Sequence, residues 1–253
     1  MSVESQSAPT PRLSLVIPAY NEEQRLRPSL EQILAFAVAQ GYPVELLVVD
    51  DGSVDRTPDL VREAAGVTPP NVSLRLLQHP RNLGKGRAVR TGCLAAAGEF
   101  VAYLDADLAT PPQEVLKLLP SLEEGADVAV GSRIHPGGYD MRASQPPYRR
   151  AVGWLYTQVR QRLLLPDIVD TQCPLKAFRR EAAQRIFARQ RLSGWAFDAE
   201  VLYLARRMGL RTSQVPVEWH HMGGSHLRVG PLQALRVLWD LLRLRWLHRG
   251  VTA

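Results

Sequence analysis

The stretch EFVAYLDADLATPPQEVLKLLPSLEE, residues 99–124, combines in one run three features that recur along the first half of the chain. An apolar segment of strand length comes first, an acidic turn follows it, and leucines at helical spacing complete the run. Alternation of apolar strands with amphipathic helices is typical of βαβ units, in which each helix carries the chain back over a parallel sheet. This stretch therefore predicts an α/β fold.

The same order of apolar run, polar turn and helical stretch appears on both sides of this segment. Further strands are predicted at 13–18, 44–50, 72–77 and 127–132, and helices at 22–40, 55–65, 85–97 and 111–124. Pro28, Pro58 and the early glycines of the third helix are expected to move some helix starts to later positions. Runs this apolar suit strands covered on both faces, so we expect a Rossmann-like, mainly parallel sheet flanked by helices.

After residue 132 the sequence changes in character. Residues 134–150 are rich in glycine, proline and arginine and predict a long loop that can act as a lid or a binding segment. Beyond the loop we expect helices at 148–164 and 197–208 and strands at 174–179 and 212–219. The predicted organisation is a flexible N-terminus at 1–12, a single domain at 13–230 and a C-terminal amphipathic helix at 231–253.

Composition narrows the class of protein. The 253 residues are 45% hydrophobic and 22% charged, which is ordinary for a globular chain, and only Cys93 and Cys173 are present. No apolar run reaches the roughly 18 residues of a membrane-spanning helix, and the first residues lack the pattern of a signal peptide, so we expect a cytoplasmic protein. The net charge of +6 suits an anionic partner. Nucleic acid is disfavoured, because no recognition motif or aromatic platform accompanies the basic residues.

Every polar turn of interest follows a predicted strand. The turns are PAYNEE (18–23), DDGSVD (50–55), NLGKGRA (82–88) and DADLA (105–109). One acidic turn is commonly only a helix cap, but parallel strands bring all four turns to the same edge, where α/β sheets bind ligands. Asp105 and Asp107 offer hard oxygen ligands for Mg2+ or Mn2+; two carboxylates alone leave room for a diphosphate on the cation. The alternative for this pair is a solvated turn.

The chain resembles a known family in an ordered set of segments. LSLVIPAYNEE (13–23), LLVVDDGSVDRT (46–57), NLGKGRAVRTG (82–92), YLDADLATPP (103–112) and VAVGSR (128–133) resemble the nucleotide-sugar half of family 2 glycosyltransferases with the GT-A fold. DTQCPLKAF (170–178), GWAFDAEVLYLARRMG (194–209), VPVEW (215–219) and GGSHL (223–227) are similar to its polyprenyl-phosphate branch, in particular dolichyl-phosphate β-glucosyltransferases and more distantly dolichol-phosphate mannosyltransferases. The resemblance implies a nucleotide-sugar half at 13–133 and an acceptor half at 134–230.

The resemblance also implies roles for individual residues. A nucleotide-diphosphate sugar, with UDP-glucose favoured, would be bound by Pro18, Ala19, Tyr20, Glu22, Val49, Asp51, Lys85, Asp105, Ala106, Asp107 and Arg133. Asp105 and Asp107 would hold Mg2+ or Mn2+, and Asp107 and Arg133 would be catalytic by neutralising the charge of the diphosphate leaving group.

The acceptor half carries further candidates. Lys176 and His226 would contact an acceptor phosphate. A phosphate is already ionised and needs little help from a base, whereas a hydroxyl acceptor would need a positioned carboxylate, for which Asp170 and Asp198 are the candidates. The alternatives are a turn residue for Asp170 and the exposed face of a helix for Asp198 and Glu200.

Three departures from the family pattern concern the substrate. Ala109 stands where mannosyltransferase relatives carry a third metal ligand, which favours the glucosyltransferase branch. Pro174 and Leu175 replace the usual glycine and phenylalanine. His226 replaces a common lysine, which can make phosphate binding pH-dependent near a pKa of about 6.5.

The C-terminal segment has a helical pattern of its own. Its apolar residues are Leu232, Leu235, Leu238, Trp239, Leu242 and Trp246, and its basic residues are Arg236, Arg243, Arg245 and Arg249. This pattern fits a helix lying on the inner membrane face, and equally one packed on the core or on a partner subunit.

The sequence thus predicts an inverting, metal-dependent transfer of a hexose, with glucose favoured, to a polyprenyl phosphate at a membrane surface. The alternatives are transfer to a soluble or protein hydroxyl, a mannosyltransferase using GDP-mannose, and a non-enzymatic nucleotide-sugar binding module. The oligomeric state is left open.

Overall fold

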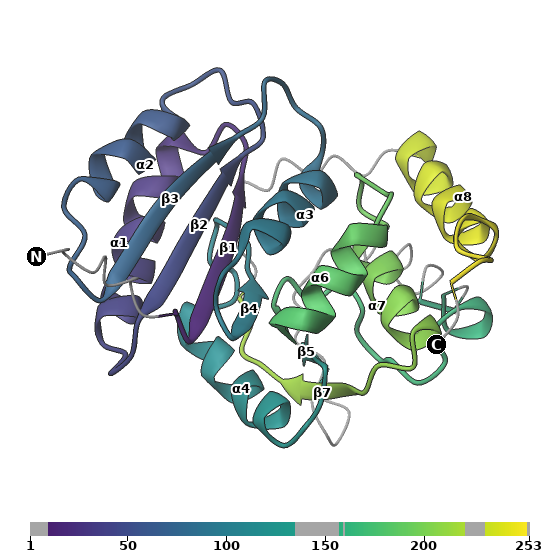
Figure 1. The fold of residues 1–253 in the computed structure, drawn as a ribbon. Coiled ribbons are helices and arrows are strands. Elements are labelled where there is room, and N and C mark those ends of the chain that lie inside the picture. Colours follow the sequence, from purple (N-terminus) through teal and green to yellow (C-terminus); the bar gives the residue numbers. More distant parts are fainter. Residues whose placement is uncertain (1–9, 135–156, 159, 221–230, 252–253) are drawn as a thin grey trace, which may run out of the picture.

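The computed structural model describes residues 10–134, 157–158, 160–220 and 231–251, and it forms one α/β domain around a seven-stranded sheet (Figure 1). The strands are β1 (Leu13–Ala19), β2 (Val44–Asp50), β3 (Val72–Gln78), β4 (Phe100–Tyr103), β5 (Val128–Ser132), β6 (Lys176–Arg179) and β7 (Thr212–Pro216). Their order across the sheet is β3-β2-β1-β4-β6-β5-β7.

The sheet is mainly parallel, as predicted. The strand pairs β1–β2, β2–β3, β1–β4 and β5–β7 are parallel. β6 lies between β4 and β5 and runs antiparallel to both. A strand from the second half of the chain therefore joins the two parallel parts into one sheet.

Helices cover both faces of the sheet, which explains why the strands are apolar throughout. The helices are α1 (Glu23–Val38), α2 (Thr57–Ala65), α3 (Lys85–Ala95), the short 3-10 turn η1 (Pro112–Glu114), α4 (Val115–Glu123), α6 (Arg180–Arg189), α7 (Phe197–Arg207) and α8 (Pro231–Leu247). α1, α2 and α4 pack in the core on one face, and α3, α6 and α7 with the inner side of α8 pack in the core on the other. The predicted doubly covered sheet is confirmed (Figure 1).

Several predicted helix boundaries need correction. α1 begins at Glu23 and contains Pro28, so this proline does not move the start of the helix; the helix tolerates one missing backbone hydrogen bond. α3 likewise begins at Lys85, before Gly86. α6 was not predicted from the sequence; it starts directly after β6 without an intervening turn.

Other predictions fall partly outside the described residues. Of the helix predicted at 148–164, residues 157–158 and 160–163 are described and are helical. The loop predicted from 134 onward lies outside the described residues after 134. At the N-terminus, Pro11 and Arg12, placed in the flexible segment 1–12, are hydrogen-bonded to Glu99, Phe100 and Pro43. Within the described part of the chain, none of the helices has both the length and the apolar character needed to span a bilayer.

Candidate active site

The turns after β1 and β2 are bound to each other at the carboxyl edge of the sheet. The backbone N–H of Asn21 donates to the Ser53 hydroxyl (2.9 Å), and the Asn21 side-chain oxygen accepts from the N–H of Val54 (3.0 Å). The N–H of Glu22 donates to Thr57 (2.8 Å). Asn21 has a φ of 52°, a left-handed conformation that asparagine tolerates. These bonds fix the two turns predicted to hold the nucleoside side by side.

Asp51 fixes the third turn, the loop between β3 and α3. Its buried carboxylate accepts from the N–H groups of Leu83 (2.9 Å) and Gly84 (2.8 Å). Nδ1 of His79 lies 2.7 Å from the same carboxylate, and Nε2 of His79 lies 2.9 Å from the Thr91 hydroxyl. Asp51 was predicted to lie beside the base of a nucleotide; the structure shows that it shapes the loop that leads to Lys85.

The paired aspartates lie at the end of β4, where Lys85 meets them. Nζ of Lys85 lies 2.6 Å from Oδ1 of Asp105, and both side chains are partly exposed. Burial is the main reason that the pKa of Asp105 lies above its ordinary value; Lys85 opposes this shift and Asp107 adds to it. Burial alone would lower the pKa of Lys85, but the charges of Asp105, Asp198 and Asp107 together raise it, so Lys85 stays cationic. One lysine thus faces several carboxylates.

This arrangement fits a divalent cation. Burial, and to a smaller extent the neighbouring charge of Asp107, disfavours the ionised form of Asp105, and a bound cation would stabilise that form. Asp107 accepts from the N–H of Ala109 (3.1 Å) through Oδ1, which orients its carboxylate. Among the residues that the structure describes, no group of three or more His, Cys, Asp or Glu side chains gathers into a metal site. Two carboxylates leave the remaining positions on Mg2+ or Mn2+ to water and phosphate oxygens, which these ions accept readily.

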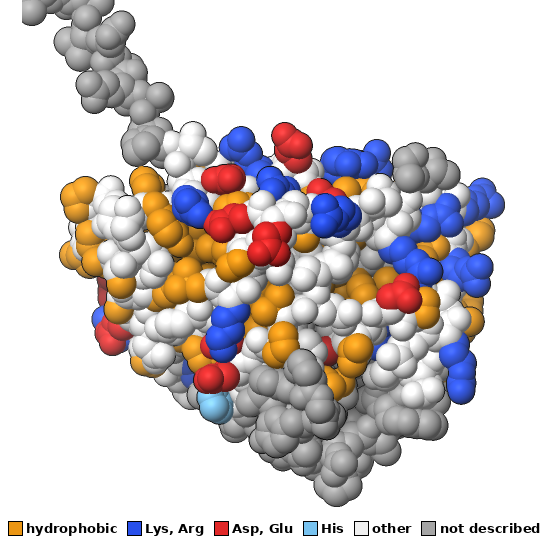
Figure 2. All heavy atoms as spheres, turned by 90° about the horizontal axis from the view of Figure 1, so that it is seen from below, with side chains coloured by type: hydrophobic (Ala, Val, Ile, Leu, Met, Phe, Trp, Pro, Cys, Tyr) orange, Lys and Arg blue, Asp and Glu red, His pale blue; other side chains and the backbone are white. Residues whose placement is uncertain are grey.

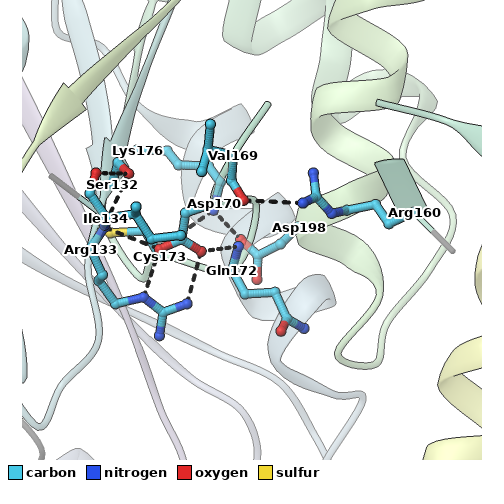
Figure 3. A network of polar contacts seen from close by, with 10 residues as sticks. All are labelled: Ser132, Arg133, Ile134, Arg160, Val169, Asp170, Gln172, Cys173, Lys176 and Asp198. Carbon is cyan, nitrogen blue, oxygen red and sulfur yellow. Dashed lines mark hydrogen bonds and ion pairs between the residues drawn. The ribbon is translucent and has the colours of Figure 1, made fainter. Parts of the chain in front are cut away.

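Arg133 and Asp170 form a buried ion pair between the end of β5 and the segment before β6 (Figure 3). Nε and Nη2 of Arg133 donate to the two oxygens of Asp170 at 2.7 and 2.9 Å, and the N–H of Arg133 donates at 3.1 Å. The Arg133 guanidinium also lies 5.5 Å from the ring centre of Trp219. The two residues predicted to act separately, on the diphosphate and on the acceptor, are therefore partners of each other.

Asp198 and Lys176 form a second buried pair (Figure 3). Nζ of Lys176 lies 2.5 Å from Oδ1 of Asp198, which also accepts from the Tyr103 hydroxyl at 2.6 Å. Burial and the charge of Asp198 raise the pKa of Tyr103 well above its usual value, so its hydroxyl stays protonated. Lys176, which was predicted to contact an acceptor phosphate, has 0% exposure, and its ammonium is paired with Asp198. The alternative that Asp198 and Glu200 lie on an exposed helix face is wrong, because both are buried.

The residues of the first turn that were predicted to hold the nucleoside differ in their exposure and in their contacts. Tyr20 is exposed beyond the end of β1, next to the partly buried Pro18 and the buried Ala19. Glu22 is held by the guanidinium of Arg25 at 2.8 and 2.9 Å.

Val49 and Ala106 are the last two residues predicted to bind the nucleotide sugar. The Val49 side chain is fully buried in the core between β2 and α3, so only the backbone of this residue is available for the predicted place near the base. Ala106 is buried between the two aspartates. His226 lies outside the described residues.

Several residues that build the site were not predicted from the sequence. Asn21, Ser53 and Thr57 join the first two turns, and Trp195 places its ring 5.6 Å from Nζ of Lys85. Asn21 had a local signal, because asparagine is common in left-handed turns. Trp195 had none, since it meets Lys85 only through the tertiary fold.

The chain is similar in sequence to known proteins. Residues 14–187 match the sequence model of the glycosyl transferase family 2. A dolichyl-phosphate β-glucosyltransferase of Trichomonas vaginalis is 34% identical over 91% of this chain and 70% of its own length. The enzyme of the same name from Homo sapiens is 33% identical over 87% of this chain and 71% of its own length.

Solved structures share the fold. Glucosyl-3-phosphoglycerate synthase from Mycobacterium tuberculosis in complex with UDP superposes with a TM-score of 0.68 at 21% identity, over 92% of this chain and 80% of that one. The same enzyme with Mn2+, UDP-glucose and phosphoglyceric acid gives a TM-score of 0.62 at 22% identity, over 96% and 81% of the two chains. At this identity the likeness concerns the fold, which is the GT-A type expected from the sequence.

Proposed function

Because this chain belongs to glycosyl transferase family 2, we propose that it is an inverting, metal-dependent enzyme that transfers glucose from UDP-glucose to a polyprenyl phosphate of the dolichyl type. The observation that carries the proposal is the meeting of Asp105, Asp107 and Lys85 at the carboxyl edge of the sheet. The glucose donor and the lipid phosphate come from the relatives in Trichomonas vaginalis and Homo sapiens, which carry that activity in their names.

The donor side of the site suits a nucleoside diphosphate. Negative charge develops on the diphosphate as it leaves the sugar. Asp105 and Asp107 would hold Mg2+ or Mn2+, and this cation would stabilise that charge. Lys85, kept cationic by its acidic neighbours, is placed to contact the phosphates. The first two turns, bound to each other through Asn21, form a preorganised support for the nucleoside.

Asp170 and Asp198 are both bound in ion pairs, which favours a phosphate acceptor over a hydroxyl acceptor. Asp170 is held by Arg133, and Asp198 by Lys176 and Tyr103. Both carboxylates are already bound to buried cations, and Asp198 also accepts from the Tyr103 hydroxyl, so neither is positioned to take the proton of a hydroxyl acceptor. A phosphate is already ionised at neutral pH and needs no such step.

A lipid acceptor requires contact with a membrane, and α8 offers a surface for it. Trp239, Leu242 and Trp246 are 63%, 49% and 66% exposed on one side of this helix, while Leu241 and Leu244 are buried on the other. Figure 2, which views the molecule from below, shows Lys and Arg side chains toward its right-hand edge. Just after α8, the guanidinium of Arg249 lies 5.8 Å from the ring centre of Trp246. Exposed tryptophans beside cations are typical of helices that lie on an anionic bilayer, so we place this protein peripherally on a membrane face.

The test of the function is a transfer assay with the purified chain, Mn2+ and a short polyprenyl phosphate. UDP-glucose should give a glucosylated lipid phosphate, EDTA should abolish the product, and Asp107→Asn should lower the rate by about 10²-fold or more, the scale of losing a preorganised charge stabiliser. Asp59→Asn, an exposed carboxylate of α2, is the matched control and should retain the wild-type rate.

Two other substrates separate the alternatives. Product from GDP-mannose instead of UDP-glucose would assign the mannosyl donor, and transfer to 3-phosphoglycerate instead of the lipid would assign a soluble hydroxyl acceptor. Either result would overturn the corresponding half of the proposal. UDP binding without transfer to any acceptor would favour the non-enzymatic alternative.

A further inference from the structure

A short segment, residues 190–196, connects α6 to α7 and lies against the start of α3; we call it the strap. The N–H of Gly86 donates to the carbonyl of Ser193 at 2.9 Å. The Gln190 side chain donates to the carbonyls of Gly86 (2.9 Å) and Leu192 (2.8 Å) and thus joins both segments. The strap is therefore hydrogen-bonded directly to the turn of the helix that carries Lys85.

The contact between the strap and α3 leaves no room for side chains at two positions. A Cβ atom on Gly84 would lie 2.6 Å from the Ser193 carbonyl oxygen, and one on Gly86 would lie 2.6 Å from the Leu192 carbonyl oxygen. Gly84 also has a φ of 98°, which favours glycine. The position of the strap thus determines where the first turn of α3 lies.

The strap and the first residue of α7 also surround the ammonium of Lys85. The ring centres of Trp195 and Phe197 lie 5.6 and 6.0 Å from Nζ of Lys85, within the range of cation–π attraction. On its other side the same ammonium contacts Asp105 at 2.6 Å. A displaced strap would therefore move the cation that faces the aspartate pair.

The Glu200 carboxylate is hydrogen-bonded to the backbone of the strap. It lies in the first turn of α7 with 0% exposure, and its two oxygens accept from the N–H groups of Arg191 (2.9 Å) and Leu192 (2.8 Å). Nε2 of His248, a buried residue just after α8, lies 2.6 Å from Oε1 of Glu200. A buried carboxylate with three polar partners is costly to lose, because those partners would remain in the core unsatisfied.

We propose that Glu200 is a positioning residue for the donor site: it fixes the strap, and the strap places Lys85 and Gly86, while His248 extends this support to the end of α8. Glu200 itself does not reach the aspartate pair, so it acts only through its neighbours. This inference rests on the proposed function, since it assumes that Lys85 meets the donor phosphates.

The test compares Glu200→Gln, which keeps the size of the side chain and removes the charge, with the wild-type chain. Hydrogen exchange followed by mass spectrometry should show faster exchange in residues 190–196 and also in residues 84–88. Calorimetry with UDP and Mn2+ should show affinity reduced about tenfold, as expected when a binding group is displaced by a fraction of an ångström. His248→Gln, which keeps a donor toward Glu200, should show a smaller change in both measurements than His248→Leu.

A matched control separates positioning from a general loss of stability. Glu45 is likewise buried and accepts from the Ser14 hydroxyl and the N–H of Ala97, but it lies at the opposite end of β2. Glu45→Gln should lower thermal stability and leave UDP affinity unchanged. Equal loss of UDP affinity in both variants, or unchanged exchange at 84–88 in Glu200→Gln, would overturn the proposal.

The exchange measurement also keeps the two proposals apart. If the wild-type chain binds no UDP, the proposed function fails, yet exchange at 84–88 still reports whether Glu200 positions this turn.

Discussion

Arg133 and Asp170 illustrate how two charged side chains can be kept inside a fold. Both are buried, and three hydrogen bonds join them. The charge of Asp170 outweighs the effect of burial and raises the pKa of Arg133 above its usual value. A buried pair of this kind adds little net stability, but removing one partner leaves an uncompensated charge.

We therefore predict that Arg133→Met lowers the free energy of unfolding by about 3–5 kcal/mol. The double variant Arg133→Met with Asp170→Leu should recover most of the loss, because it removes the orphaned carboxylate as well. Urea unfolding followed by circular dichroism measures both. A double variant as unstable as the single one would show that the loss comes from packing rather than from an unpaired charge.

The functional residues could be predicted from the sequence more readily than their interaction partners. The acidic pair at 105 and 107 was identified because a carboxylate motif after a strand has local meaning. The partners of Asp51, Asp170 and Asp198 were not, since each is provided by a residue far away in the sequence. Residue type indicated that these positions matter, but only the fold determines which groups they bind.

Among the described elements, α8 exposes three large apolar side chains, Trp239, Leu242 and Trp246. Its inner side is anchored in the core by Leu241 and Leu244, so substitutions on the outer side should leave the fold intact. Arg249 lies 5.8 Å from the ring centre of Trp246, which places a cation beside the exposed aromatic side chains.

We therefore predict that Trp239→Ser combined with Trp246→Ser reduces binding to vesicles containing anionic phospholipid by about tenfold or more, since burial of one large apolar side chain is worth about 1.5–3 kcal/mol. Vesicle flotation measures this binding. Val54→Ser with Val67→Ser, two exposed apolar residues elsewhere, is the control and should bind as the wild type does. Retained binding in the tryptophan variant would assign the α8 surface to a protein partner or a second copy of the chain.

The elements of the first half were predicted more completely than those of the second. Each strand of the first half is followed by a turn with glycine, proline or acidic residues, so its boundaries are marked locally. α6 was missed because Arg179 both ends β6 and precedes the helix, with no breaker between them. The antiparallel direction of β6 follows from long-range pairing, which the local pattern does not contain.

At the level of the domain, one sheet joins the two halves that the family resemblance separates at 133/134. β6 comes from the acceptor half, yet it pairs with β4 and β5 of the nucleotide-sugar half. Core residues from both halves also pack together on the face covered by α3, α6 and α7. The two halves therefore form a single structural unit.

This continuity predicts one cooperative unfolding transition. All five tryptophans lie after residue 150, so their fluorescence reports on the second half, whereas far-ultraviolet circular dichroism reports on the whole domain. The two signals should give the same urea midpoint, as expected for a two-state domain. Midpoints that differ by more than the fitting error would show that the halves unfold separately.

The place of β6 in the sheet also matters while the chain is being synthesised. β1 to β4 can pair with one another as soon as they leave the ribosome, but both neighbours of β5 are encoded later, at Lys176–Arg179 and Thr212–Pro216. Until then β4 has one open edge and β5 has two, and open strand edges attract other chains. The emergence of β6 from the ribosome is therefore the step at which the nascent sheet closes its central gap, and the interval before it is when a chaperone would protect this chain most.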